Sequence, residues 1–411
     1  MKTSERPLRV TMVNKYYSPP HLGGVETVVR TLSEGLVEHA DAHVRALVSN
    51  EGRGRERVEE TIGGVQVVRL PRQLAVSSAP VAVGMPGALR AEMRRVGPRG
   101  PQPPDVVNLH SPYPWGELSF LQASPDVPGV VLYHSDIVRQ KRLLVVYRPF
   151  LERFLDRVDL IVTSSPNMVR SSSFLAPRAE KCRVVPFGLP AGRFLATPGV
   201  LRRAAELRAS HAGHMIVLFV GRLVYYKGVD VLVRAMAGVD ADLVLIGRGP
   251  LEGELRETAL AAGIAARITF LQPESDDELS AWYRAADVLC LPSVARSEAF
   301  GLVQIEAHAA GTPVVSTDLS TGVPYANRHG VTGLTVPPGD AAALAAGLNR
   351  LLADDELRAR LGRQARERAL IEFTVPRMVA RTLDVYGEAI ERHAARGAGS
   401  PARPRDTGAR T

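Results

Sequence analysis

An α/β fold with two parallel sheets is predicted for this chain of 411 residues. Its strand-like segments are nearly continuous runs of Val, Ile and Leu, which are typical of strands buried on both faces. These runs alternate with segments long enough to form helices, as they do in parallel sheets that helices cover. The alternation stops near residues 189–199 and then begins again. The sequence therefore predicts two Rossmann-like domains, which also agrees with the length of the chain.

The individual elements follow from the same pattern. Helices are expected at about residues 26–38, after the first strand, and at 375–392 near the end of the chain. Residues 393–411 are rich in Gly, Pro, Ala and Arg and are expected to be disordered. The strands expected in the first half are residues 8–14, 42–49, 65–70, 106–110, 130–134, 160–164 and 184–187. Those expected in the second half are residues 215–220, 242–247, 268–271, 288–291, 312–316 and 333–336.

The composition excludes several classes of protein. Hydrophobic residues make up 45% of the chain, as in soluble globular proteins, and no run of apolar residues is long enough to cross a membrane. The N-terminal residues lack the apolar core of a signal peptide. Cys182 and Cys290 lie in apolar strand-like segments and are expected to be reduced core thiols of a cytoplasmic protein. The net charge of +8 is spread along the chain, so nucleic acid is not an expected partner.

Two glutamates separated by eight positions form the most informative motif. Glu298 follows the strand-like segment 288–291, and Glu306 lies on the helical segment after it. Because a helix rises about 1.5 Å per residue, this spacing suits the two ends of an elongated polar ligand. A phosphate or a sugar oxygen binds well at a helix N-terminus, where free backbone N–H groups are available. Such groups are expected between the glutamates, at Phe300, Gly301 and Leu302.

Three further segments follow strands, at the edge where open parallel sheets bind ligands. The pair Gly23-Gly24 would let the backbone approach a phosphate, although a tight turn explains it equally well. Arg222 and Lys227 could hold a diphosphate, Arg through paired hydrogen bonds and Lys as a point charge. Two surface cations are the alternative, but only five of the 51 basic residues are lysines. Gly247 could flank a nucleotide or form a strand-to-helix turn.

Histidines are the remaining candidates. His110 and His134 each end a strand of the first half, and His134 begins the segment His-Ser-Asp at the expected edge of the site. A structural role remains the alternative, especially for His110. No cluster of His and Cys has the spacing of a metal site. The segment Asp240-Ala-Asp242 begins a strand, which is the wrong end of the sheet for a metal-binding acidic pair.

Over nearly its whole length the chain resembles the retaining glycosyltransferases of family 4, which have the GT-B fold. The strongest matches are Gly221-Arg222 with Lys227-Gly228, and Glu298 with Glu306 followed by Gly-Thr-Pro-Val-Val. Segments 133–141 and 316–327 are similar to a bacterial branch. Members of that branch mostly transfer mannose or related sugars in polysaccharide assembly.

The resemblance implies two Rossmann-like domains whose parallel sheets face a central cleft. Residues 1–188 would form the acceptor domain and residues 189–374 the domain for the nucleotide-sugar donor. The helix at 375–392 would cross back to the first domain. The donor would bind mainly to the second half and the acceptor to the first, with domain closure completing the site.

The resemblance also implies roles for single residues. Glu306 would bind the ribose of the sugar nucleotide, and Glu298 the hydroxyls of its hexose. Arg222 and Lys227 would hold the diphosphate and neutralise the leaving group, and His134 would lie near the donor sugar and the acceptor. Donor contacts through backbone groups or strand ends are implied for Gly23, Gly24, Gly221, Gly247, Leu271, Phe300, Gly301 and Leu302.

The expected reaction requires no metal or other cofactor. Cleavage of a sugar–diphosphate bond creates a cation-like sugar and an anionic leaving group, and fixed positive charge lowers this barrier. No residue stands out as the carboxylate nucleophile that retaining hydrolases use. Front-face return is therefore favoured, in which the acceptor enters on the side of the leaving group. The expected donor is a GDP- or UDP-sugar, with mannose favoured and an α-linkage formed; Gln272 replaces a Gly of many relatives and leaves the base contacts open.

The acceptor is expected to be a hydroxyl of a glycan, a lipid-linked or a small molecule. Segment 139–157 is basic and amphipathic and could rest on an anionic membrane at the inner face of the cell. An ordinary covering helix with a solvated basic face is the alternative. Two other functions remain open: another sugar-nucleotide enzyme of this fold, such as an epimerase or a phosphorylase-like enzyme, and a non-catalytic nucleotide-sugar-binding protein.

Overall fold

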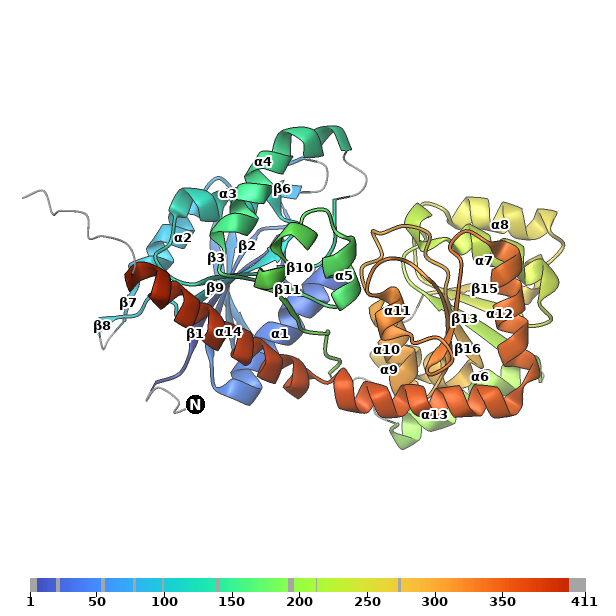
Figure 1. Cartoon of the computed structure of the whole chain (residues 1–411). Coiled ribbons are helices and arrows are strands. Elements are labelled where there is room, and N and C mark those ends of the chain that lie inside the picture. The colour runs from blue at the N-terminus through green and yellow to red at the C-terminus, as the bar shows by residue number, and fades with distance from the viewer. Residues whose placement is uncertain are drawn as a thin grey trace, which may run out of the picture.

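The computed structural model describes residues 6–19, 23–52, 56–76, 79–97, 100–137, 141–190, 196–211, 213–272 and 275–398. Two sheets lie in separate halves of the molecule, and helices flank each of them (Figure 1). The prediction of an α/β protein with two Rossmann-like halves is confirmed.

The first sheet has eight strands in the order β12-β11-β10-β9-β1-β2-β4-β3. All neighbours are parallel except β3, which is antiparallel to β4. Its strands are β1 (Arg9–Val13), β2 (His43–Ser49), β3 (Val58–Ile62), β4 (Val65–Leu70), β9 (Val106–Ser111), β10 (Gly129–Tyr133), β11 (Leu160–Thr163) and β12 (Cys182–Val184). Two short hairpins pair β5 (Leu74–Val76) with β6 (Ala79–Val81) and β7 (Val96–Gly97) with β8 (Gly100–Pro101).

The second sheet has six strands in the order β15-β14-β13-β16-β17-β18, and all of its neighbouring strands are parallel. Burial on both faces explains why its central strands consist almost entirely of apolar residues. The strands are β13 (Ile216–Val220), β14 (Asp242–Ile246), β15 (Ile268–Leu271), β16 (Val288–Leu291), β17 (Val314–Thr317) and β18 (Gly333–Val336).

Helices cover both sheets. Those of the first half are α1 (Gly24–Ala40), α2 (Met85–Met93), α3 (Pro114–Ala123), α4 (Lys141–Arg157) and α5 (Pro166–Ser171). Those of the second half are α6 (Pro198–Ser210), α7 (Val229–Ala235), α8 (Glu252–Ala261), α9 (Asp276–Ala285), α10 (Leu302–Ala310), α11 (Val323–Ala326), α12 (Ala341–Ala353) and α13 (Asp355–Glu372), followed by α14 (Val375–Ala398). Side-chain oxygens cap the starts of α6, α9, α12 and α13 by accepting backbone N–H groups, and the capping residues are Thr197, Ser275, Asp340 and Asp354.

One expected strand is misplaced. The ladder with β11 uses Cys182–Val184, so the prediction of a strand at 184–187 is wrong. Val185, just past the end of β12, still donates its N–H to the Thr163 carbonyl of β11 at 2.9 Å, and both Val185 and Phe187 are buried in the hydrophobic core. The apolar character of Phe187 therefore reflects burial between the two halves, against Phe300, rather than pairing in the sheet.

Two other expectations differ from the structure. The edge strand β3 was not predicted, because its Val-Glu-Glu-Thr-Ile sequence is mostly polar and its side chains are largely exposed. Helix α14 continues to Ala398, so residues 393–398 are helical rather than disordered. Residues 399–411 lie outside the described residues.

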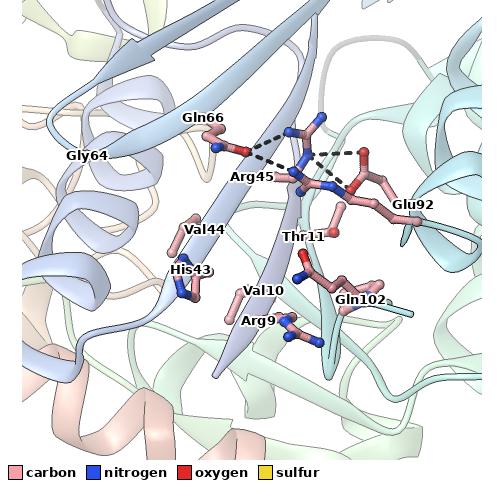
Figure 2. A pocket seen from close by; sticks show the side chains of 12 residues that line it. Arg9, Val10, Thr11, His43, Val44, Arg45, Gly64, Gln66, Glu92 and Gln102 are labelled. Atoms are coloured by element: carbon pink, nitrogen blue, oxygen red, sulfur yellow. Dashed lines mark hydrogen bonds and ion pairs between the residues drawn. The ribbon is translucent and has the colours of Figure 1, made fainter. Parts of the chain in front are cut away.

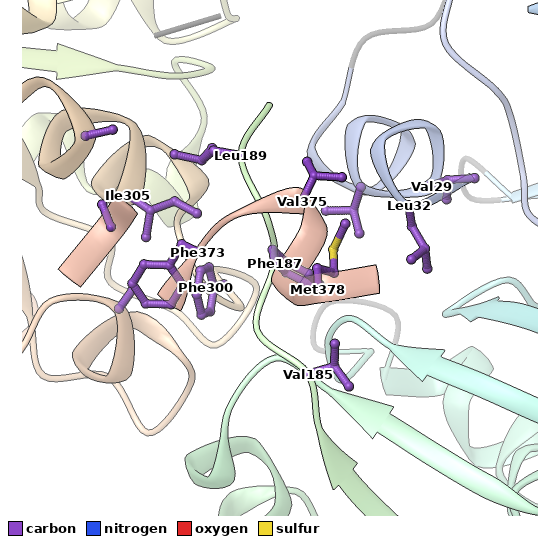
Figure 3. Close-up of a cluster of buried hydrophobic side chains, with 14 of the residues drawn as sticks. Val29, Leu32, Val185, Phe187, Leu189, Phe300, Ile305, Phe373, Val375 and Met378 are labelled. Carbon is purple, nitrogen blue, oxygen red and sulfur yellow. The ribbon is translucent and has the colours of Figure 1, made fainter. Parts of the chain in front are cut away.

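A cluster of buried apolar side chains joins the two halves (Figure 3). The ring of Phe187 from the first half lies 5.2 Å from that of Phe300 in the second, and Phe300 lies 5.9 Å from Phe373. The chain crosses between the halves twice at this place. Leu189 forms a bridge with Thr374, and its N–H donates to the carbonyl of Phe373 at 2.8 Å. One continuous core therefore extends through both crossings.

Helix α14 leaves the second half and packs along the first (Figure 1). Gly35 on α1 permits this close approach, because a Cβ at that position would lie 2.6 Å from Val375. Farther along the helix, Glu388 forms an ion pair with Arg183 on β12. These contacts attach the end of the chain to the first sheet.

The two cysteines are free thiols. Cys290 on β16 is fully buried, and Cys182 on β12 is partly buried and packs against the apolar core of the first sheet. Within the described parts of the chain, none of the helices combines the length and apolar character needed to span a bilayer.

Candidate functional site

Loops from the carboxyl ends of the two sheets meet where the halves join. The order of strands reverses between β1 and β9 in the first sheet and between β13 and β16 in the second. Open parallel sheets bind their ligands beside such reversal points. Asp136 after β10 and Arg296 after β16 form an ion pair at 2.7 Å. The junction of the two halves therefore lies at the ligand-binding edge of both sheets.

The structure brings Lys227 and Glu298 together, although they are distant in the sequence. Lys227 ends a short 3-10 helix, Tyr225–Lys227, after β13, and Glu298 follows the neighbouring strand β16. The Nζ of Lys227 lies 2.5 Å from Oε2 of Glu298, and the Ser293 hydroxyl donates to the same oxygen at 3.1 Å. The two charged side chains are only 12% and 10% exposed. They form a fixed and largely buried ion pair at the sheet edge.

Arg222 lies in the same loop as Lys227 but is exposed. Its guanidinium donates to the hydroxyl of Tyr226 at 3.2 Å. At the nearby strand ends, Gly221 and Gly247 have φ values of 152° and 149°, which residues other than glycine rarely adopt. The N–H of Gly247 donates to Leu271 at the end of β15, at 2.9 Å. The ends of three strands thus pack backbone against backbone beside the loop that carries Arg222.

Helix α10 carries the predicted backbone donors. Gly301 caps it with a φ of 75°, and the N–H groups of Leu302 and Val303, at the start of its first turn, have no acceptors within a helix. The N–H of Gln304 donates to the Gly301 carbonyl at 2.9 Å. The side chain of Phe300 is buried between the halves, so only its backbone can contact a ligand. In the second turn, Oε2 of Glu306 accepts a hydrogen bond from the buried Tyr283 hydroxyl at 2.5 Å. Tyr283 therefore fixes the orientation of this carboxylate.

His134 follows β10 and is only 4% exposed. Its Nε2 lies 3.0 Å from Nδ1 of His110, whose Nε2 lies 3.1 Å from the side-chain nitrogen of Asn108. Burial, assisted by His110 and Lys15, lowers the pKa of His134 well below its usual value. Burial also lowers the pKa of His110 to about 3. Near neutral pH both rings are uncharged, so His134 can form a hydrogen bond but supplies no positive charge.

The pair Gly23-Gly24 lies at the start of α1, on the other side of the junction. A Cβ on Gly24 would meet open space, so packing within the chain does not require a glycine there. Lys15 precedes this segment and is partly buried. Burial lowers the pKa of its ammonium, while nearby Glu26 and Glu117 act in the opposite direction. This end of the first sheet therefore adds another cation close to the junction.

Sequence reasoning missed several residues that support the site. Lys15 had one usable signal, the rarity of lysine in the chain. Glu117 had none: its carboxylate is fully buried and accepts hydrogen bonds from the Ser111 hydroxyl and the Tyr113 N–H, while burial raises its pKa. Nothing in the sequence distinguishes Tyr283 from an ordinary aromatic residue of the core. The support that it gives to a carboxylate emerges only when distant segments fold together.

Among the described residues, no group of three or more His, Cys, Asp and Glu side chains could hold a metal ion. Asp242, at the amino end of β14, lies 2.6 Å from Nδ1 of His211 instead. This partner agrees with a structural role for the acidic segment before β14.

A cavity of about 270 Å³ lies at the opposite edge of the first sheet (Figure 2). Its walls come from the amino ends of β1, β2 and β4, from the end of α2 and from the segment after it. Arg45 projects into it, where Glu92 at 3.1 Å and the Gln66 side chain at 2.6 Å bind its guanidinium. None of the lining residues is a candidate from the sequence. The junction between the halves therefore remains the candidate site.

The arrangement at the junction combines two kinds of chemistry. Arg222, Lys227 and the starts of α1 and α10 present positive charge or backbone N–H groups, which suit phosphate oxygens. Glu298 and Glu306 provide carboxylates, which accept hydrogen bonds from hydroxyl groups. A ligand that carries phosphates and hydroxyl-rich rings matches this combination.

Models of two protein families match the two halves of the chain. Residues 22–193 match the model described as Glycosyltransferase Family 4. Residues 207–368 match the model described as Glycosyl transferases group 1. These ranges contain all the candidate site residues.

Two similar proteins extend this match over nearly the whole chain. The O-antigen chain mannosyltransferase C of Escherichia coli is 33% identical over 384 residues, covering 93% of this chain and 99% of its own. The D-rhamnosyltransferase WbpZ of Pseudomonas aeruginosa is 35% identical over 370 residues, covering 89% of this chain and 92% of its own.

Solved structures show the same architecture. Sucrose-phosphate synthase from Thermosynechococcus elongatus superposes with a TM-score of 0.76 at 24% identity, covering 93% of this chain and 99% of its own. Anabaena HepE, solved in complex with UDP, gives a TM-score of 0.71 at 19% identity, covering 92% of this chain and 100% of its own. The fold and the sequence thus agree on one assignment: the chain belongs to the family 4 glycosyltransferases, enzymes of the GT-B fold that use nucleotide-sugar donors.

Proposed function

We propose that this glycosyltransferase moves a hexose, with mannose favoured, from a GDP- or UDP-sugar to a hydroxyl acceptor and retains the α-configuration. The observation that carries the proposal is the ion pair of Lys227 and Glu298, 2.5 Å between Nζ and Oε2, beside the exposed Arg222. Together they supply two cations for a diphosphate and one carboxylate for sugar hydroxyls. Their place at the carboxyl edge of the second sheet is where an open parallel sheet binds its ligand.

The donor extends, in this proposal, along the edge of the second sheet. Glu306, oriented by Tyr283, binds the ribose hydroxyls, and Glu298 binds the hexose hydroxyls. Backbone N–H groups at Gly301 and Leu302 bind the phosphate or sugar oxygens. The tight strand ends at Gly221, Gly247 and Leu271 surround the nucleotide. Gly23 and Gly24 approach the phosphates from the first half.

The chemical step proposed is front-face return. The bond between the anomeric carbon and the phosphate oxygen breaks, the acceptor oxygen bonds to the same face, and its proton passes to the departing diphosphate. Arg222 and Lys227 stabilise the negative charge that develops on that diphosphate. Lys227 and Ser293 hold Glu298 through Oε2, and in this proposal the carboxylate positions the hexose rather than attacking it. The neutral His134 contributes a hydrogen bond near the sugar and the acceptor.

The first half, residues 1–188, binds the acceptor in this proposal, and residues 189–374 bind the donor. The acceptor is a glycan, a lipid-linked molecule or a small molecule with a free hydroxyl. The two similar proteins are named for mannosyl and D-rhamnosyl transfer. D-rhamnose is 6-deoxy-D-mannose, so the two sugars share the axial hydroxyl at C2. This shared feature supports a manno-configured hexose in the donor site.

A panel of GDP-, UDP-, dTDP- and ADP-sugars tests the donor assignment. We expect a GDP- or UDP-linked manno-configured sugar to raise the melting temperature most, because a ligand that binds only the folded state stabilises it. The same donor should then support transfer of the hexose to an added acceptor. A GDP-glucose control differs from GDP-mannose only at C2 and should give less transfer. If no sugar nucleotide stabilises the protein, the proposed donor site is wrong; a changed sugar nucleotide without transfer would indicate an epimerase.

Helix α4 also supports a peripheral contact with an anionic membrane. One face packs into the core through Leu151, Phe154 and Leu155. On the other face three apolar side chains are exposed by 74%, 73% and 48%, namely Val145, Val146 and Phe150. An ordinary covering helix would present polar residues on that face. A helix that lies at a membrane interface instead combines exposed apolar side chains with basic ones. Arg139 and the side chains of Lys141 and Arg142, part of the same hypothesis, lie outside the described residues.

Vesicle flotation tests this contact. We expect the wild type to float with vesicles that contain anionic lipid and to be released at high salt. The double variant Val146→Asp/Phe150→Asp should remain in solution, because charged side chains oppose insertion of the helix face. Leu201→Asp is the matched control, since Leu201 is 50% exposed on α6 of the other half. Absence of flotation by the wild type, or equal loss in the control, would end the membrane proposal.

A further inference from the structure

One ion pair connects the two halves directly at the candidate site. Arg296 donates to Oδ2 of Asp136 at 2.7 Å, and the two side chains are 28% and 16% exposed. The Tyr133 and Ser172 hydroxyls both donate to the other oxygen of Asp136, at 2.9 and 2.6 Å. Arg296 also donates to the Ser320 hydroxyl at 2.6 Å. Each side chain of the ion pair therefore also has hydrogen bonds within its own half.

The pair lies next to both candidate loops. Asp136 is two residues beyond His134, on the loop after β10. Arg296 is two residues before Glu298, within a turn that the Glu298 N–H closes by donating to Ala295 at 3.0 Å. Movement of Arg296 must therefore move the backbone of Glu298, and movement of Asp136 must move that of His134.

Neighbouring residues press the same loop against the first half. Ala299 packs on the apolar cluster of the first sheet, and the ring of Phe300 lies 5.2 Å from that of Phe187. A second polar link joins the Ser171 hydroxyl to the Ser320 carbonyl at 2.5 Å. The loop that carries Glu298 thus contacts the second sheet on one side and the first half on the other.

We infer that Asp136 and Arg296 are positioning residues that hold the His134 loop and the Glu298 loop at the separation needed for transfer. The inference rests on the proposed function of His134 and Glu298. A partly exposed ion pair adds little to the stability of a protein. Its effect here is geometric, because the donor bound to one half must meet an acceptor bound to the other, and small misplacements of reacting groups slow catalysis strongly.

Kinetics of Arg296→Gln test the inference. The variant keeps a polar side chain but removes the guanidinium, and with it the charge that Asp136 binds and the donor to Ser320. We expect kcat to fall by roughly 10- to 100-fold, while nucleotide affinity and melting temperature stay close to wild type. Asp136→Asn should give the same split. Arg296→Lys keeps the charge and should recover part of kcat.

Arg203→Gln is the matched control, because Arg203 binds Glu278 at 2.9 and 3.0 Å within the second half alone. It should leave kcat unchanged. Wild-type kcat in Arg296→Gln, or an equal loss in Arg203→Gln, would overturn the inference.

A distance measurement separates this inference from the proposed function. Spin labels at Val83 and Leu260, which are 61% and 69% exposed in different halves, report the separation of the domains. With GDP or UDP bound, Arg296→Gln should give longer or broader distances than wild type, whether or not a donor is turned over. Identical distributions would overturn the positioning role, whereas failure of every donor with a changed distribution would count against the proposed function alone.

Discussion

Lys227→Ala is expected to lower kcat by roughly 10²- to 10³-fold, as removal of one group that stabilises transition-state charge does in other enzymes. The ammonium would no longer reach the leaving diphosphate. In addition, within the described part of the chain Glu298 would keep only the Ser293 hydroxyl as a partner for a carboxylate that is 10% exposed. The loss of a partner for a largely buried charge should cost about 1–3 kcal/mol of stability, so the variant should fold. Transfer kinetics and thermal unfolding measure the two effects.

Arg222→Ala provides a comparison, because Arg222 is exposed and bonds only weakly to Tyr226 at 3.2 Å. We expect a similar loss of kcat but no change in melting temperature. Arg234→Ala is the control: Arg234 is 51% exposed on α7, where it pairs with Asp230, and it should affect neither quantity.

A double-mutant cycle shows whether the ion pair acts as one unit. If Lys227 and Glu298 depend on each other, Lys227→Ala/Glu298→Ala should cost little more kcat than the worse single variant. Fully multiplicative losses would mean that the two side chains act independently. Near-normal transfer by Lys227→Ala or by Arg222→Ala would contradict the proposed mechanism.

The central strands of both sheets could be predicted because burial on two faces forces them to be apolar. The same signal misled at residues 184–187, since Val185 and Phe187 are buried without belonging to a strand. Strand β3 was missed for the opposite reason: it is an exposed edge strand with a polar sequence. An apolar run thus reports burial, and it locates strands only where burial and pairing coincide.

The candidate site shows the same division. Residues that follow strands could be assigned to one sheet edge, because parallel strands end there together. The contacts among them could not be predicted, since they depend on side-chain geometry. Lys227 and Glu298 are brought together by the order of strands β13 and β16, and Asp136 and Arg296 by the meeting of the two halves. No local pattern in the sequence encodes either pair.

Gly247→Ala should produce the largest structural effect at the site. An added Cβ would lie 2.8 Å from the carbonyl carbon of Gly221 and would overlap its oxygen, and the φ of 149° is unfavourable for alanine. The obstacle is backbone rather than a flexible side chain, so the strand ends of β13 and β14 must separate. Overpacking and backbone strain together should cost about 2–5 kcal/mol. Because Gly221 precedes Arg222, nucleotide binding should also be lost.

Gly253→Ala is the control that isolates this cause. Gly253 lies on α8 in the same half, and a Cβ there would meet open space. Alanine should stabilise this helical position by about 0.5–1 kcal/mol, because it restricts the unfolded chain and favours helix. Thermal unfolding and nucleotide titration of both variants would measure the contrast. A Gly247→Ala protein that keeps wild-type stability and affinity would mean that the two strand ends can separate freely, and that their close packing does not shape the donor site.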